Sequence, residues 1–280
     1  MANKIIEFLF QIGFTIDDIN EFYEKAYDFV EKDGRQSRGP DCIYAIVQED
    51  EDSIDLNDTG ELVEAYWEKG WISDFVHFRR NNFDSYKGTY YKAFPTRYKL
   101  PDFKLTKSMR RILKKNEDLK TVIRPLRITP AKSNLHDLYY FLRFGEQPRK
   151  SLLEDYKYIV YYPTKLMELC IFKENKLIAC SIFEVGNFST YSNTVFWDLT
   201  EKSRSLGTLT ILLEIQYAIE QKMFYYYMGH FYPQNPNYHY KTRFGGLELY
   251  DWERDCWVSF NYRPRIKEML KQKLPRRKYD

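Results

Sequence analysis

The stretch MELCIFKENKLIACSIFEV, residues 167–185, indicates the fold more clearly than any other part of the chain. Its two apolar runs are separated by Glu174-Asn175-Lys176, a pattern that predicts two antiparallel strands joined by a tight turn. Further along, NTVFWDL at 193–199 is another apolar run with β-branched residues, and it predicts a third strand. This part of the chain is therefore expected to be an antiparallel sheet.

A helix and a further strand follow these runs. SLGTLTILLEIQYAIEQK, residues 205–222, places apolar residues at helical spacing, and MFYYYMG, residues 223–229, returns to a strand pattern. The apolar stripe of the helix comprises Leu209, Leu212, Ile215 and Ile219. Antiparallel strands followed by strand, helix and strand predict an α+β fold, in an order that resembles the GNAT acyltransferase core.

Upstream of this region, the spacing of apolar residues predicts a smaller number of helices and strands. A basic helix is expected from Ser108, a strand over 122–129 that ends at Pro130, and a helix near Leu135–Phe144. Nearer the N-terminus, residues 15–33 predict an acidic amphipathic helix.

A short helix over 59–69 is expected to stop at Gly70, because glycine readily ends a helix. The pattern changes near residue 100. We therefore predict a small mixed N-terminal domain over 1–100, with an acidic first half, and a GNAT-like domain with a basic C-terminal tail over 101–280.

The composition is that of a folded, soluble protein. The 280 residues are 44% hydrophobic and 30% charged with a net charge of +3, values that argue against a disordered or fibrous chain. No apolar run approaches the roughly 18 residues of a membrane span, and no signal peptide is apparent. The scattered Cys42, Cys170, Cys180 and Cys256 show no metal-ligand spacing, so we expect a reducing, cytoplasmic setting.

Charge is distributed unevenly along the chain. The first 60 residues contain 15 acidic and 5 basic residues, whereas the remainder has an excess of bases. One basic cluster comprises Lys104, Lys107, Arg110, Arg111, Lys114 and Lys115, and a second lies in the tail from Arg263 to Lys278. Such clusters favour a polyanion as partner, because cations that neutralise phosphates release counterions. The alternative is a solvated helix face.

The residues FWDLTEKSRSLGT, 196–208, carry the first chemical signal. They place Asp198 at a strand end and Ser205-Leu206-Gly207-Thr208 at the start of a helix, where amides attract anions or a developing oxyanion. Gly207 would let a ligand approach the backbone. The alternative is that the serine and glycine provide only a cap and a close packing contact.

The motifs in this half of the chain, taken in order, resemble those of the aminoacyl-tRNA–protein transferases, the arginyl- and leucyl-transferases of the N-degron pathway. The matching segments are Phe196-Trp197-Asp198, Ser205-Leu206-Gly207-Thr208, Tyr226-Tyr227-Met228-Gly229, and Tyr240-Lys241 with Phe244. An upstream segment is similar at Phe103, Ser108, Arg110, Arg111, Leu113 and Asn116. The resemblance runs from about Cys42 to the end of the chain and is strongest over 103–257.

The chain also departs from this family. The family's N-terminal Cys-Gly-Tyr-Cys motif survives only as Cys42 and Tyr44, with Ala45 at the second cysteine, and the later cysteine pair is Ala93-Phe94. Four ligands are usual for a tetrahedral metal site, so we predict no metal in this domain. Other differences are Ile72-Ser73 after Gly70-Trp71, Thr200 for an aspartate, and Gly246 for a proline.

The resemblance implies transfer of arginine or leucine from aminoacyl-tRNA to the N-terminal amine of a protein or peptide that begins with an acidic residue. An aminoacyl ester is already activated, so no cofactor is expected besides aminoacyl-tRNA as co-substrate. We also expect a monomer and no membrane partner.

The site residues follow from chemistry and resemblance together. Asp198 or His230 would orient or deprotonate the amine, Tyr240 and the amides of Gly207 and Thr208 would bind the tetrahedral oxygen, and a cation would hold the acidic acceptor. The expected catalytic residues are Asp198, Tyr240, Lys241 and His230; the substrate-binding residues are Arg204, Ser205, Gly207, Thr208, Tyr227 and Arg243; the tRNA-binding residues are Lys107, Arg110, Arg111, Lys114 and Lys115.

Several alternatives stay open at this stage. Asp198 can simply cap a turn, and the many tyrosines can either stack on the unpaired CCA end of tRNA or fill the core. Residues 204–209 partly match an acyl-CoA pyrophosphate loop, although Leu209 would crowd it. The chain can also be a non-catalytic member that binds tRNA or a partner, or an aminoacyl-tRNA-dependent enzyme that acts on a different peptide or a small molecule.

Overall fold

The computed structural model describes residues 59–74, 77–86, 89–145, 148, 151–156 and 164–271. The helix predicted over 15–33 and the positions Cys42, Tyr44 and Ala45 lie outside these residues. The short helix predicted over 59–69 is confirmed as α4 (Thr59–Glu68), which is followed by Gly70 in the left-handed region at φ 78°.

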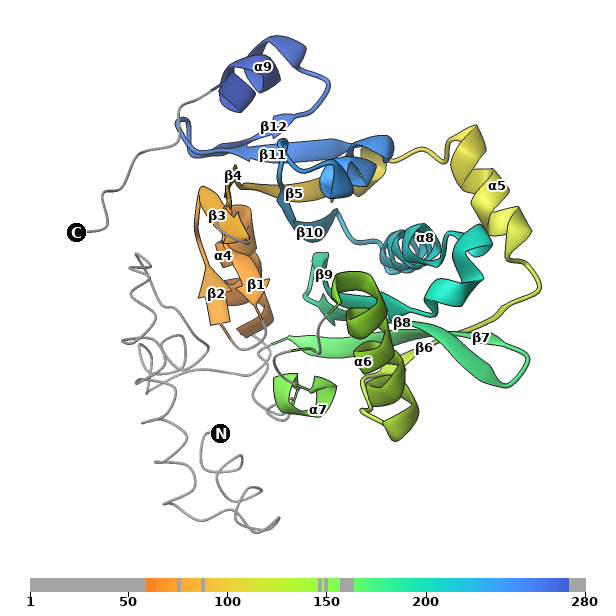
Figure 1. Cartoon of the computed structure of the whole chain (residues 1–280). Helices are drawn as coiled ribbons and strands as arrows, with labels where there is room; N and C mark the ends of the chain where they lie inside the picture. Colours follow the sequence, from red (N-terminus) through yellow and green to blue (C-terminus); the bar gives the residue numbers. More distant parts are fainter. Residues whose placement is uncertain are drawn as a thin grey trace, which may run out of the picture.

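The described residues form one large mixed sheet and two small two-stranded sheets (Figure 1). In order across the large sheet, its strands are β12 (Cys256–Ser259), β11 (Leu247–Asp251), β5 (Phe94–Lys99), β10 (Tyr225–Phe231), β9 (Ser189–Trp197), β8 (Lys176–Val185), β7 (Lys165–Lys173) and β6 (Lys120–Pro125). The β9 and β10 pair is parallel, and all other neighbours are antiparallel. The small sheets pair β1 (Ile72–Asp74) with β2 (His77–Arg79), and β3 (Phe83–Tyr86) with β4 (Thr89–Lys92).

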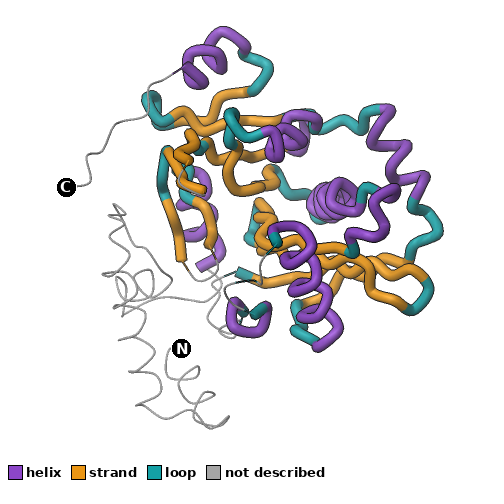
Figure 2. Tube along the Cα trace, in the orientation of Figure 1, coloured by secondary structure: helices purple, strands orange, loops and turns teal. Residues whose placement is uncertain are grey.

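Helices flank the strands on both sides, as Figure 2 shows. The α-helices after α4 are α5 (Lys107–Lys115), α6 (Pro130–Phe144), α7 (Leu152–Asp155), α8 (Leu206–Glu220) and α9 (Arg263–Lys271). Shorter 3₁₀ segments are η1 (Leu100–Asp102), η3 (Leu199–Arg204) and η4 (Pro236–Arg243). Figure 1 shows α4 to the left and α8 to the right of β9 and β10. The prediction of an α+β fold is confirmed.

The hairpin and the helix that were predicted from residues 167–222 are present as β7, β8 and α8. Leu209, Leu212 and Ile215 of α8 are buried as predicted, but Ile219 is 44% exposed, so its place in the stripe was wrong. It lies in the last turn beside Ala218, which is fully buried, so at this end the buried face of α8 passes through Ala218 and Ile219 faces outward.

Two upstream predictions need correction at their ends. The strand predicted over 122–129 is β6, which begins at Lys120 and ends at Pro125, because its register with β7 stops at Met167. The helix predicted from Leu135 begins earlier, at Pro130, a residue that is well suited to the first turn of a helix since it has no N–H to satisfy.

Helices α6 and α8 pack on opposite faces of β8. Ile182 contacts the cluster that contains Leu135 and Tyr139 of α6, and the next residue, Phe183, packs against Leu213 and Tyr217 of α8. Successive side chains of a strand point to opposite faces, so the two helices enclose this part of the sheet.

A buried ion pair ties α6 to the sheet. Lys132 of α6 lies 2.5 Å from the Glu168 carboxylate of β7, and Arg124 lies 2.7 Å from the same carboxylate. The amide of Arg127 donates to Glu168 as well, at 3.0 Å. A buried carboxylate with several donors fixes geometry, so this contact sets where α6 lies over the strands.

Two of the four cysteines are neighbours in space. Cys170 and Cys180 are directly opposite each other across β7 and β8, fully buried, with 3.9 Å between their sulfur atoms. Sequence spacing did not show this pairing, because it depends on the hairpin register. Both are free thiols.

The division into two domains at residue 100 stays a prediction. Strand β5, which ends at Lys99, pairs with β10 on one side and β11 on the other. Trp67 of α4 packs against the rings of Tyr191 and Tyr227 from the same sheet. The described residues before residue 100 therefore share the core of the large sheet.

Gly70 tests this packing, because a Cβ at that position would lie 2.8 Å from the ring of Tyr250. Gly145 is a matched control: it follows α6 with nearly the same φ, 76°, and has no atom within 4 Å of such a Cβ. We expect Gly145→Ala to cost about 1–2 kcal/mol from the left-handed backbone alone. Gly70→Ala should cost about 1–3 kcal/mol more from overpacking. Denaturant unfolding of both variants measures the difference, and equal costs would contradict the tight contact.

Candidate active site

The parallel pair β9 and β10 stays together for only a short distance. Tyr225, Tyr226 and Tyr227 pair with Ser189, Thr190 and Tyr191, and within the described residues the pairing of the two strands ends there. Beyond this point β9 continues through 192–197 and β10 through 228–231. We call this divergence the β9/β10 fork.

The fork coincides with an irregularity in β10. The register of β10 with β5 shifts between Tyr227 and His230, and Gly229 lies between them with φ of 58°. Glycine adopts such a backbone without the strain that a side chain brings. The carbonyls of this bulge leave the regular ladder and need other donors.

Lys241 and Thr96 supply those donors. The Lys241 ammonium donates to the carbonyl of Met228 and, at 2.6 Å, to that of His230. The Thr96 hydroxyl lies 2.8 Å from the Gly229 carbonyl. Lys241 is only 4% exposed, and burial lowers the pKa of its ammonium to about 7. Its amine therefore stabilises the bulge inside the protein. The sequence had instead suggested that Lys241 contacts the substrate.

Tyr240 belongs to η4, which contacts β10, and Tyr139 belongs to α6, which contacts β9. Tyr240 of η4 interacts electrostatically with Tyr139 and Arg143 of α6 and with Glu214 of α8. Burial raises the pKa of Tyr139 to about 12 and also raises that of Tyr240, so both hydroxyls stay protonated and can donate.

A buried carboxyl group lies beside the fork. Glu214 of α8 is 1% exposed and accepts hydrogen bonds from the hydroxyls of Ser181 and, at 2.6 Å, of Tyr226. Ser192, the first residue of β9 beyond the pairing, also hydrogen-bonds to it. Burial outweighs these bonds and raises the pKa of Glu214 to about 7. Sequence reasoning missed this residue; a glutamate in an apolar helix stripe was the available signal.

A second buried acid, Glu184 of β8, has a similar environment. It is 1% exposed, accepts from the Thr164 hydroxyl at 2.7 Å and from the Asn193 amide at 3.1 Å, and burial raises its pKa to about 7. It pairs with Tyr191 across β8 and β9. Acids with raised pKa values gather at functional sites more often than elsewhere, although structural networks produce them too.

Asp198 caps a turn, as its alternative interpretation proposed. Its carboxylate accepts from both the amide and the hydroxyl of Thr200, at 2.9 and 2.6 Å, and pairs with Lys176 at 2.7 Å. Burial alone would raise the pKa of Asp198, but these partners outweigh it and lower the pKa. The carboxylate thus fixes the end of β9 and is a weak base.

The start of α8 differs from the expected anion site in three respects. The side chain of Ser205 makes no capping hydrogen bond, and its backbone is left-handed at φ 56°. The Thr208 amide donates to the Ser205 carbonyl at 3.0 Å. At Gly207, a Cβ would lie 2.8 Å from the Trp197 ring, so this glycine is explained by packing rather than by approach of a ligand.

Arg204 is occupied by carboxylates of the same chain. It makes two contacts with Asp118, at 2.8 and 2.9 Å, and a third with Glu201 at 3.2 Å. Tyr227 is 3% exposed and packs among the rings of Trp67, Tyr191 and Trp257, so it belongs to the core. These two residues therefore serve the fold in the described structure.

Arg243 lies at the end of η4 and is exposed. Among the described residues it has no carboxylate within ion-pair distance. Of the three cations expected to hold an acidic acceptor, Lys241 is buried and Arg204 is paired, so Arg243 retains an unengaged guanidinium. Arg143 of α6 is also exposed, and its charge acts on both Tyr139 and Tyr240. Sequence reasoning did not single it out.

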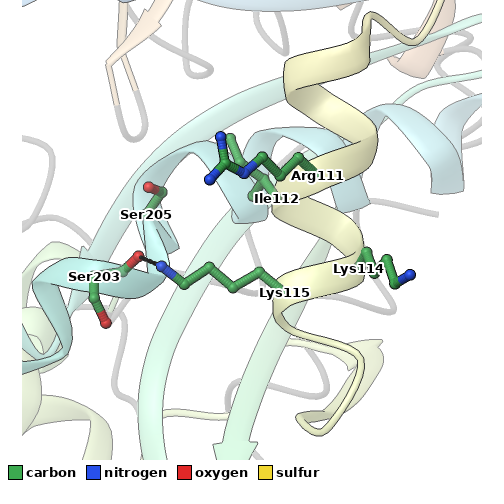
Figure 3. A pocket seen from close by; sticks show the side chains of 6 residues that line it. All are labelled: Arg111, Ile112, Lys114, Lys115, Ser203 and Ser205. Atoms are coloured by element: carbon green, nitrogen blue, oxygen red, sulfur yellow. Dashed lines mark hydrogen bonds between the residues drawn. The ribbon is translucent and has the colours of Figure 1, made fainter.

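The basic residues of α5 frame a hollow of about 520 Å³ (Figure 3). This basic hollow is lined by Arg111, Ile112, Lys114, Lys115, Ser203 and Ser205. In Figure 3, Arg111 and Lys115 point toward the serines, whereas Lys114 projects from the other side of α5.

Helix α5 is fixed to the far wall of the hollow. Lys115 donates to the Ser203 carbonyl at 2.5 Å, and the Asn116 amide donates to that of Arg204 at 3.0 Å. The five residues expected to bind tRNA, Lys107, Arg110, Arg111, Lys114 and Lys115, are all exposed on this helix.

The positions that replace family cysteines are filled by core residues. Ala93 is fully buried, Phe94 is 2% exposed, and the Ala93 carbonyl accepts from Trp252 at 2.8 Å. Within the described ranges no group of three or more His, Cys, Asp and Glu side chains gathers where it could hold a metal ion. The prediction that the N-terminal domain binds no metal stays a prediction.

Gly246 has a structural explanation. Its φ is 78°, a value that proline, fixed near −65°, cannot adopt. A Cβ there would also lie 2.6 Å from the Lys99 carbonyl oxygen. The backbone between η4 and β11 therefore follows a path that the family's proline would not permit.

In the described part of the chain, no helix has both the length and the apolar character to cross a membrane.

In a comparison with known proteins, residues 131–251 match the family model described as "Arginine-tRNA-protein transferase, C terminus". The aspartate/glutamate leucyltransferase of Acinetobacter baumannii strain AYE is 29% identical over 159 residues, which are 55% of this chain and 58% of that protein. That of Leptospira interrogans serovar Lai is 29% identical over 151 residues, 51% of this chain and 59% of that protein. The chain thus spans less than two thirds of the length of these curated relatives.

Solved structures give weaker likenesses. The C-terminal domain (DUF2156) of a putative lysylphosphatidylglycerol synthetase from Agrobacterium fabrum matches with a TM-score of 0.40 and 12% identity, covering 49% of this chain and 46% of that one. A tandem GNAT protein from the clavulanic acid biosynthesis pathway matches with a TM-score of 0.35 and 11% identity, covering 56% and 50%.

The buried acid Glu214 makes a pH-dependent contribution to stability that can be measured. Its pKa rises from 4.5 to about 7 on folding, so the native state holds the proton more tightly than the unfolded chain. Stability should therefore fall as the pH rises from 4.5 to 7, by up to about 3 kcal/mol. Glu214→Gln should remove its share of this fall and leave the share of Glu184, whereas Glu220→Gln, at the exposed end of α8, should leave the whole fall unchanged. Unfolding free energies across this pH range decide the matter; identical profiles for both variants would exclude the raised pKa.

Proposed function

We propose that the chain transfers an amino acid from aminoacyl-tRNA to the N-terminal α-amine of a protein or peptide, because residues 131–251 match the family model described as "Arginine-tRNA-protein transferase, C terminus". The amino acid is arginine or leucine, and the acceptor begins with an acidic residue. The names of the matched relatives, which specify aspartate or glutamate and leucine, support this choice.

One observation carries the proposal. The family match includes β9, α8, β10, η4 and all but the first residue of α6, which together supply the walls of the β9/β10 fork. These elements carry Tyr139 and Tyr240, whose hydroxyls stay protonated, the buried carboxyl group of Glu214 and the exposed Arg243. That combination suits an ester carbonyl and an amine that must be held in a fixed geometry.

The chemistry requires placement rather than a resident cofactor, since the ester bond to tRNA is already activated. The amine nitrogen attacks the ester carbonyl, the C–N bond forms, and the C–O bond to the terminal ribose breaks. The proton lost by the amine is balanced by the proton taken up by the ribose oxygen. We assign the Tyr240 hydroxyl to the developing oxyanion, because a buried donor that stays protonated stabilises negative charge well.

The tRNA interface in this proposal is the exposed face of α5 together with the basic hollow. The cations there are held in place by the contacts of Lys115 and Asn116 with residues 203 and 204. Cations that neutralise phosphates supply most of the affinity in such an interface. The reaction depends on charged tRNA, so we place the protein in the cytoplasm, where it acts as a monomer.

Neutralising the basic hollow should weaken tRNA binding and flatten its salt dependence. For Arg111→Gln with Lys114→Gln and Lys115→Gln, we expect the slope of log affinity against log salt to shrink by about 0.7–0.9 for each lost phosphate contact. The exposed Lys69 and Lys165, replaced by Gln together, serve as the control and should leave the slope unchanged. Binding isotherms of total tRNA at several salt concentrations provide the measurement. A slope that does not change in the triple variant removes α5 from the interface.

Transfer itself can be measured with a pool of charged tRNAs and peptides of varied first residue. We expect mass to be added to Asp- and Glu-initiated peptides. Arg243→Gln should lower kcat/KM for these peptides by about tenfold or more, since a charge-assisted hydrogen bond is lost, with no effect on tRNA affinity. Arg254→Gln, in the exposed turn between β11 and β12, is the control. If no charged tRNA supports transfer to any peptide, the chain is a binding protein of this family.

A further inference from the structure

His230 carries a buried ring nitrogen that the fold itself does not satisfy. The residue is 4% exposed, and its Nε2 atom has no hydrogen-bond partner among the described residues. Buried polar side-chain atoms nearly always have a partner, so an orphan such as this one calls for a ligand or a specific purpose.

The other ring nitrogen is held by a chain of two residues. Nδ1 lies 3.3 Å from the hydroxyl of Tyr232, and that hydroxyl lies 3.0 Å from Oδ2 of Asp84 in β3. A carboxylate only accepts hydrogen bonds, so Tyr232 donates to Asp84. The Tyr232 oxygen then accepts from Nδ1–H of His230, which leaves Nε2 with its lone pair.

The charged neighbours keep this imidazole neutral. Burial, and after it the positive charges of Arg79 and Lys241, hold the pKa of His230 well below its usual value. Arg79 itself is paired with Asp74 at 2.9 Å and approaches Asp84 at 3.8 Å. A neutral ring in a fixed tautomer presents an acceptor over the whole physiological pH range.

The position of the ring is also fixed, and it lies next to the fork. His230 follows the bulge at Gly229, and its carbonyl accepts from Lys241 at 2.6 Å. The Tyr232 ring packs edge-on against Tyr238 at 4.5 Å, and Tyr238 interacts electrostatically with Tyr240. One hydrogen bond and one ring contact thus connect His230 to η4, the element that carries Tyr240.

We propose that His230 Nε2 accepts a hydrogen bond from the α-amino group of the acceptor peptide, and that Tyr232 and Asp84 are positioning residues that fix the tautomer this bond requires. The inference rests on the proposed function and specifies where the acceptor binds. It also joins β3, which lies before residue 100, to the site that the later strands form. Residues from before and after residue 100 would thus both contribute to binding the acceptor.

The tautomer can be tested by ¹⁵N NMR of histidine-labelled protein, with the His230 signals assigned from His230→Asn. We expect His230 to be protonated on Nδ1 alone in the free protein. An Asp-initiated peptide should shift the Nε2 resonance, and the same peptide with an acetylated amine should not. A proton on Nε2, or an Nε2 signal that saturating free peptide leaves unmoved, overturns the proposal; the second result would indicate that water fills the position.

Kinetics provide a second readout. Tyr232→Phe keeps the ring that packs on Tyr238 but removes the hydroxyl, and we expect about a tenfold fall in kcat/KM for the peptide with unchanged tRNA affinity. Asp84→Asn should no longer fix the tautomer of His230, so that part of the molecules should carry the proton on Nε2. His239→Asn, an exposed histidine of η4, is the control and should behave as wild type.

The two proposals fail in different ways. If the wild-type protein transfers amino acids while free and acetylated peptides affect Nε2 alike, the assignment of His230 is wrong and the proposed function stands. If no transfer occurs but the free peptide alone shifts Nε2, the acceptor site is confirmed in a protein that does not catalyse the reaction.

Discussion

The contact of Lys241 with the bulge in β10 is the constraint on which the site depends. A strand that leaves its parallel neighbour after three pairs exposes carbonyl groups that must find donors inside the protein. Lys241 and Thr96 provide them for residues 228–230. A neutral amine has two N–H groups, and two carbonyls accept them, so the brace persists when the ammonium loses its proton.

That brace has consequences on both faces of the sheet. Beyond the bulge, the Tyr232 hydroxyl hydrogen-bonds to both His230 and Asp84, which links β10 to β3. Helix α6, held by the buried Glu168 and Lys132 pair, supplies the opposite wall. The region is therefore built from fixed backbone contacts, and its polar groups are oriented before any substrate arrives.

Most polar groups around the fork are uncharged at neutral pH, and the physical reason differs from one group to the next. Burial keeps the tyrosine hydroxyls protonated, leaves Glu184 and Glu214 near their midpoints, and together with two cations keeps His230 neutral. The exposed cations lie at the surface, on α5 and at Arg143 and Arg243. This separation suits a reaction in which a polyanion is held at the surface while the carbonyl chemistry takes place in a low-dielectric interior.

The sequence by itself determined the α+β class, the hairpin of β7 and β8, helix α8 and the basic character of α5, because these depend on local spacing of apolar and charged residues. The ordered motifs also pointed to the transferase family. Local pattern failed at the ends of elements, as at Ile219, where the packing of the helix buried Ala218 instead.

Only the tertiary structure decided which motif residues have free chemical groups. Asp198 is engaged by Thr200 and Lys176, Arg204 by Asp118 and Glu201, and Gly207 is required by Trp197, partners that lie up to 86 residues away in the chain. Glu214, Arg143 and the Asp84, Tyr232 and His230 chain became visible only when distant strands were placed together. Sequence spacing records residue types along one dimension, whereas burial and hydrogen bonding are settled by contacts across the fold.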